Sequence, residues 1–243
     1  MHPRVKQTGV VKRKTWRISG IGFAALLALR VGVVTAEVPA NDLEQAFQHL
    51  STYTWSQSRA PLNAIEAAIR ATSNDAVARK TLERRLAGVL RTGAPFPAQQ
   101  FVCRKLGQIG TADSIPALAP LLVDPALSHP ARFALERIPD PGAAEALRQA
   151  LPRTEGNVQV GIINSLGALA DTTATGPLID LLPGADADIA LAAVAALGHF
   201  ATLDAAKKQK PEIVAALKQA LRASPHTAVQ DKARRVLERV DAP

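Results

Sequence analysis

Residues 158 to 182 read VQVGIINSLGALADTTATGPLIDLL and describe two short amphipathic helices joined by one tight turn. Apolar side chains recur at helical spacing in the first helix and form a continuous edge in the second. Asp171 opens the turn, where its carboxylate is expected to accept hydrogen bonds from the free amides of the following helix. The stretch therefore predicts a helical hairpin.

The same pattern returns along the chain. Leucines at the matching first-helix position are spaced by 29, 31, 31 and 40 residues, and three of them precede a second-helix leucine by 12 residues. A recurring unit of this length is typical of stacked arrays, in which each hairpin buries its apolar face against its neighbours. The sequence predicts an all-α fold, a right-handed α-solenoid. The aligned residues are Leu106, Leu135, Leu166, Leu197 and Leu237 in first helices, Leu118, Leu147, Leu178 and Leu217 in second helices, and Asp113, Asp140, Asp171 and Asp204 in turns.

The net charge of +8 belongs to the beginning of the chain. Residues 1–36 contain seven basic residues and no acidic one, which leaves 22 basic and 21 acidic residues from Glu37 onward. Non-specific nucleic-acid affinity comes mostly from an excess of Lys and Arg. A body with a charge of +1 therefore argues against a nucleic-acid partner.

Residues 1–36 have the features of a secretory signal peptide. A basic front at residues 12–17 precedes an apolar run from Ile18 to Val34, and small residues then predict cleavage after Ala36. Arg30 interrupts the run, and its 17 residues are short for a membrane span. An uncleaved anchor and a cytoplasmic chain stay open as alternatives. The mature protein is expected to be periplasmic or secreted, without a membrane span.

The segments FVCRKLGQIGTADSIPALAPLL and INSLGALADTTATGPLIDLL resemble the HEAT-like repeat of the family named after phycobilisome lyases. The resemblance covers about residues 97–240. It implies HEAT-like hairpins, but members of that family include chromophore lyases, an iron hydroxylase and plain binding scaffolds. The expected organisation is a signal peptide at 1–36, divergent N-terminal helices at 37–96, and a repeat array with a C-terminal cap at 97–243. The stretches TYTWSQSRAPL and LSHPARFALERIPDP also look like uncharacterised exported bacterial repeat proteins.

Standard catalytic and cofactor motifs are missing from the sequence. The iron hydroxylase of the resembled family uses His-Glu pairs, whereas the histidines in the expected repeats and helices are followed by Leu, Pro, Phe and Thr. Gly-rich phosphate loops and GxSxG are missing too. Cys103, the only cysteine, aligns with the inward column of Ile163 and Val194, which predicts a buried thiol. We expect no catalytic residue, no metal and no cofactor.

Two groups of residues are candidates for binding. Arg132 occupies the apolar column of its repeat and Glu136 the glycine column, so the two can pair on one helix face. Contact with an anionic ligand is the alternative for Arg132. Arg234 and Glu238 repeat the substitution in the last unit, where a solvated cap explains it. Tyr53, Trp55 and Arg59 form the aromatic cluster of the predicted mature chain, either a lid over the first unit or a partner contact.

The fifth unit has an insertion of eight residues around AAKKQKPEI, residues 205–213, which is expected to be a solvated charged loop; a place on a binding face is the alternative. The chain as a whole predicts an exported, non-enzymatic scaffold that holds a protein or peptide partner on its concave face. The alternative is a lyase- or hydroxylase-like enzyme handling a chromophore or metal.

Overall fold

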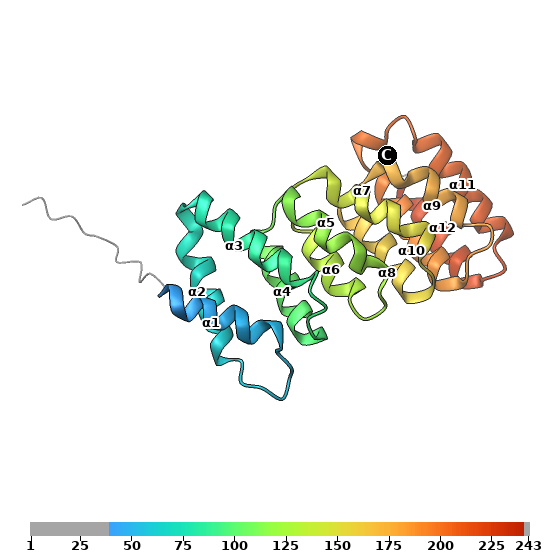
Figure 1. Ribbon diagram of the computed structural model, residues 1–243. Helices are drawn as coiled ribbons and strands as arrows, with labels where there is room; N and C mark the ends of the chain where they lie inside the picture. Colours follow the sequence, from blue (N-terminus) through green and yellow to red (C-terminus); the bar gives the residue numbers. More distant parts are fainter. Residues whose placement is uncertain (1–38, 241–243) are drawn as a thin grey trace, which may run out of the picture. The chain divides into compact units, whose positions relative to one another are not determined.

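The computed structural model describes residues 39–240, and this part of the chain is all-α, with no strand. The predicted signal peptide and its cleavage site lie outside the described residues. Short 3-10 turns connect or extend the helices, for example Ala112–Ser114, Thr172–Ala174 and Asp204–Ala206. The helices, which follow one another in chain order (Figure 1), are α1 Ala40–Ser51, α2 Asn63–Ala71, α3 Ala76–Val89, α4 Phe96–Ile109, α5 Ile115–Leu118, α6 Ser128–Leu135, α7 Pro141–Ala150, α8 Gly156–Ala168, α9 Thr175–Leu181, α10 Ala187–Phe200, α11 Lys210–Ala223 and α12 Thr227–Val240.

The hairpins stack in two layers, as the leucine register predicts. The first helices form one layer, in which α4 packs on α6, α6 on α8, α8 on α10 and α10 on α12. The second helices α5, α7, α9 and α11 form the other layer and contact one another far less. Figure 1 shows α8, α10 and α12 side by side. The predicted helical-repeat architecture is confirmed, and α12 continues the layer of first helices to the end of the described residues.

The aligned leucines are the centre of the packing. All four second-helix leucines and the first four first-helix leucines are fully buried, and Leu237 in the cap is 8% exposed. Cys103 is also fully buried, like its aligned partners Ile163 and Val194, so the predicted inward column is confirmed. The core is a row of contacts between neighbouring hairpins rather than a single centre.

The N-terminal helices extend this arrangement. The buried carboxylate of Glu83 on α3 accepts the backbone N–H of Thr111 at 2.6 Å and the hydroxyl of Ser114 at 2.5 Å. Both residues lie in the turn between α4 and α5, so α3 contacts the array as a second helix does. Lys105 of α4 reaches Glu66 of α2 at 2.7 Å, which links the corresponding first helices. Helix α1 packs on α2 and covers this end.

The turn aspartates differ from the prediction in part. Asp140 caps α7 by accepting the N–H of Gly142 at 2.8 Å, as expected. No side-chain cap is made by Asp113, Asp171 or Asp204, so their predicted role is wrong. Two of these carboxylates pair with the preceding second helix: Lys80 of α3 lies 2.8 Å from Asp113, and Arg148 of α7 binds Asp171. These aspartates hold successive hairpins together. Of the helices formed by residues 39–240, none is long and apolar enough to cross a bilayer.

Candidate functional site

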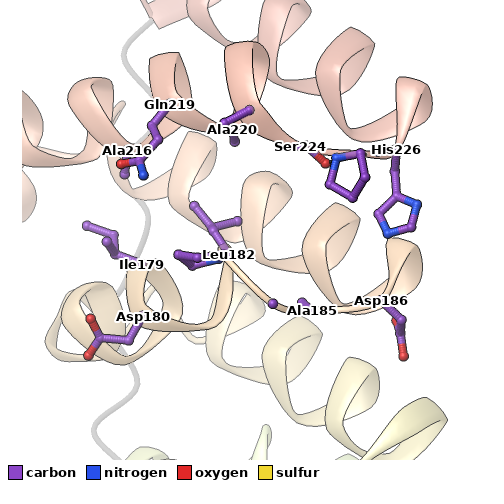
Figure 2. Close-up of a pocket in the computed structure, with 14 residues that line it drawn as sticks. Ile179, Asp180, Leu182, Ala185, Asp186, Ala216, Gln219, Ala220, Ser224 and His226 are labelled. Carbon is purple, nitrogen blue, oxygen red and sulfur yellow. Dashed lines mark hydrogen bonds between the residues drawn. The ribbon is translucent and has the colours of Figure 1, made fainter.

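A groove of about 690 Å³ opens between the second helices α9 and α11. We call it the α9–α11 groove. One side is the end of α9 with the connection that follows it, and the other is the C-terminal half of α11 with the turn before α12 (Figure 2). Its lining residues are Ile179, Asp180, Leu182, Pro183, Gly184, Ala185 and Asp186 on the first side, and Ala216, Gln219, Ala220, Ala223, Ser224, Pro225 and His226 on the second.

Unequal helix lengths create this groove. Helix α9 has 7 residues, whereas α11 has 14. Pro183 stands two residues after the end of α9, and a proline cannot continue a helix without losing a backbone hydrogen bond. The second half of α11 therefore extends beyond the end of its neighbour. It faces the gap with alanines, whose small side chains do not fill it.

The floor of the groove is apolar and its rim is acidic. Ile179 and Leu182 are half-buried, and Ala216 and Ala220 opposite them are buried. In Figure 2, Asp180 and Asp186 lie on either side of Leu182 along one lip.

Both aspartates also line a second hollow of about 670 Å³ on the other side of the connection, together with Glu155. The groove and this hollow therefore share one acidic ridge, and neither is lined by a Lys or Arg.

The two rim carboxylates have different local roles. Asp186 Oδ1 accepts the N–H of Ile189 at 3.0 Å and caps α10. Asp180 is exposed and has no hydrogen bond or ion pair within residues 39–240. His226 is the other titratable residue of the groove, and its backbone N–H donates to Ser224 Oγ at 3.3 Å. This arrangement suits binding through apolar contact and charge.

The structure separates the residues of the predicted aromatic cluster. Tyr53 is 8% exposed and belongs to the core. Trp55 is 70% exposed, with its ring edge-on to Phe96 at 5.5 Å between centroids. Arg59 donates to Glu66 at 2.8 Å. Trp55 is therefore not shielded, and both a lid over the first unit and a partner contact stay predictions.

Arg132 and Glu136 do not form the predicted direct ion pair. Arg132 Nη1 donates to the carbonyl oxygen of Gly161 at 2.9 Å and to Ser165 Oγ at 3.0 Å, whereas Glu136 accepts from the same Ser165 hydroxyl at 2.6 Å. Both side chains therefore bind α8 of the next repeat. Burial lowers the pKa of the Arg132 guanidinium, and the charge of Glu136 opposes the shift. Arg132 and Glu136 therefore connect α6 to α8 through hydrogen bonds. Nothing in this geometry favours an anionic ligand at Arg132.

The remaining candidates lie at the end of the array. Arg234 is exposed on α12 and pairs with Asp231 at 2.7 Å instead of with Glu238, which agrees with a solvated cap. In the insertion, Lys207 and Lys208 are exposed as predicted. Lys210 begins α11 and donates to the carbonyl oxygen of Val240 at 3.1 Å, so it secures the end of α12.

Burial raises the pKa of the Cys103 thiol to about 12. A covalent ligand on this sulfur is inconsistent with its position. Residues 39–240 contain no group of three or more His, Cys, Asp or Glu side chains placed to hold a metal ion.

Residue patterns alone missed the α9–α11 groove, because half of its lining is Ala, Gly and Pro, which carry no chemical motif. One signal was present. No Lys or Arg occurs between Arg153 and Lys207, a stretch that contains six acidic residues. The +1 charge of the whole body hides this local excess.

No protein-family model matches this chain, and no curated protein is similar to it at a significant level. The lyase-type resemblance therefore has no further support. Among solved structures, the chain is similar to an engineered protein from a structural-genomics programme, with 24% identity, 84% of this chain and all of that chain covered, and a TM-score of 0.50. At this identity the likeness concerns the fold alone.

Two designed armadillo repeat proteins also match. One has 20% identity, covers 82% of this chain and all of its own, and has a TM-score of 0.47. The other, described as designed for modular peptide recognition, has 20% identity, covers 81% of this chain and 98% of its own, and has a TM-score of 0.48. The helical-repeat fold is shown by the stacked hairpins of the structure itself.

Proposed function

We propose that this chain is an exported, non-enzymatic scaffold that holds a protein or peptide partner in the periplasm or at the cell surface, with the α9–α11 groove as the contact site. A helical-repeat fold suits an interaction scaffold, because its stacked hairpins present long surfaces on a rigid frame. The observation that carries the assignment is the groove itself. It presents an apolar floor that α9 and α11 leave uncovered.

The groove fits a peptide or loop better than a nucleic acid. Its lining has no Lys or Arg to neutralise phosphates. Apolar side chains with a few polar groups at the rim are the usual composition of a site that binds through contact area. We therefore place the partner contact on the layer of second helices, and a contact on the concave face stays a prediction.

The proposal is tested by photo-crosslinking in the native envelope. A photo-activatable residue replaces Ala223, which lines the groove, or Ala215, which is exposed on the same helix outside the lining. We expect a discrete crosslinked product from position 223 and none from position 215. Equal products from both positions, or a product obtained only from Trp55, would contradict the assignment of the groove.

The enzymatic alternative requires a bound metal or chromophore. Elemental analysis and an absorption spectrum of the protein purified from its native host test it directly. A stoichiometric metal or a visible absorption band would overturn the non-enzymatic proposal.

A further inference from the structure

We infer that the α9–α11 groove selects partner segments in which a Lys or Arg stands beside a large apolar residue. The inference rests on the proposed function and adds the chemistry of the partner.

The carboxylates that line the groove are not accompanied by any Lys or Arg in the lining. Its rim carries Asp180 and Asp186, and Glu155 extends the acidic ridge into the neighbouring hollow. All three are exposed, and within the described part of the chain none of them forms an ion pair. These carboxylates can therefore meet a cation brought by a partner, Asp186 through the oxygen that does not cap α10.

The opposite wall does not neutralise this ridge. Helix α11 carries the exposed Lys218 and Arg222, but neither lines the groove. Gln219, Ser224 and His226 are the groups there that can meet a polar ligand. A partner carboxylate would face like charges at the rim, whereas an ammonium or guanidinium group would meet complementary ones.

The floor sets the second requirement. The half-buried Ile179 and Leu182 face the buried alanines 216 and 220 across the groove. An inserted Leu, Met or Phe side chain would remove apolar surface from water on both sides. A cation alone would leave this floor exposed, so the apolar neighbour is required for binding and the cation for selection.

The test measures binding of short labelled peptides to the purified protein by fluorescence anisotropy. The probe is Gly-Ser-Gly-Leu-Lys-Leu-Gly-Ser-Gly, and the comparison peptides replace the central Lys by Gln or Glu, or both Leu residues by Ser. Exposed charge pairs contribute modestly, so we expect the Lys peptide to bind about three- to tenfold more tightly than the Gln peptide at low salt. The preference should shrink at high salt, because ions screen exposed charges.

A matched pair of variants locates the effect. Asp180→Asn combined with Asp186→Asn removes both rim charges, and Asn at position 186 retains a residue that caps helices well. We expect this variant to bind the Lys and Gln peptides equally. The control, Asp188→Asn combined with Asp204→Asn, removes the same charge outside the lining and should keep the preference.

Equal affinity of the unchanged protein for the Lys and Gln peptides would overturn the inference, and so would a preference that survives in the Asp180→Asn, Asp186→Asn variant. If none of the peptides binds but position 223 still crosslinks a partner, the charge rule fails and the scaffold proposal stands. If the Lys peptide binds as expected but no crosslink forms in the envelope, the scaffold proposal fails instead. Self-association that occupies the groove, detected by sedimentation, would also count against a basic partner segment.

Discussion

Arg132 and Gly161 are coupled across the interface between α6 and α8. A β-carbon on Gly161 would collide with the guanidinium of Arg132, which lies over the glycine and donates to its carbonyl oxygen. The large side chain of Arg132 in one repeat thus fits because Gly161 in the next repeat has no side chain. Within residues 39–240 the buried Arg132 Nε has no hydrogen-bond partner, so one donor of the guanidinium group is left unpaired.

This coupling predicts that the effect of Gly161→Ala on the free energy of unfolding changes sign when Arg132 is removed. Gly161→Ala should lower the free energy of unfolding by about 1 kcal/mol, because the flexible Arg132 side chain can move away only by giving up its hydrogen bonds to Gly161 and Ser165. In an Arg132→Ala background the same change should stabilise by up to about 1 kcal/mol, because alanine favours a helix interior over glycine. Urea unfolding of the two single variants and the double variant measures the coupling, and additive effects would contradict the described contact.

The Cys103 thiol should not react with thiol reagents in the folded protein. Its thiol is fully buried and its pKa is raised to about 12, so the reactive thiolate is scarce and inaccessible. We expect a thiol reagent at pH 8 to label the protein only as urea unfolds it. Rapid labelling without urea would show that the inward column opens.

Glu66 predicts a pH dependence of stability. Its pKa lies below the ordinary 4.5, first because of the hydrogen bond from Lys105, while burial opposes the shift. A lowered folded-state pKa stabilises the protein above the unfolded value, and that contribution is lost as the pH falls through the folded value. The stability difference between the unchanged protein and Glu66→Gln should be largest near neutral pH and shrink below about pH 4.5. Urea midpoints across this range check it, and a constant difference would contradict the assignment.

At the scale of helices, periodicity gave the positions of the hairpins but not the partners of their polar residues. The leucine register follows from helical geometry, so it could be predicted residue by residue. The role of Glu83 could not be predicted from the sequence, because its partners lie about thirty residues ahead in another repeat. Asp171 is a similar case, since its Arg148 partner belongs to the preceding repeat. Contacts between repeats depend on the stacking geometry, which spacing alone does not fix.

The hydrogen bonds from the turn between α4 and α5 to Glu83 of α3 should contribute measurably to stability. Glu83→Ala leaves the Thr111 amide and the Ser114 hydroxyl without their acceptor in a buried place, so we expect a loss of about 2–3 kcal/mol. Glu44→Ala is the control, because Glu44 is an exposed partner of Arg85 and should contribute about 0–1 kcal/mol. Equal losses in urea unfolding would mean that α3 is not held through Glu83.

The whole chain combines a repetitive core with an uneven surface charge. Residues 106–206 hold four basic and eleven acidic side chains, whereas the segments on either side of them are richer in Lys and Arg. The repeats explain the core, and the shortened α9 explains where a groove opens. The groove depends on the stacking of the repeats, because its two walls, α9 and α11, both pack against α10.

Hydrogen exchange after removal of α12 tests the stacked array most directly. In a row of interfaces, a chain that ends after Pro225 should lose amide protection in α10 and α11, which pack against α12, and keep it in α4 to α7. A uniform loss of protection from α4 to α11 would show a single cooperative core and contradict the account.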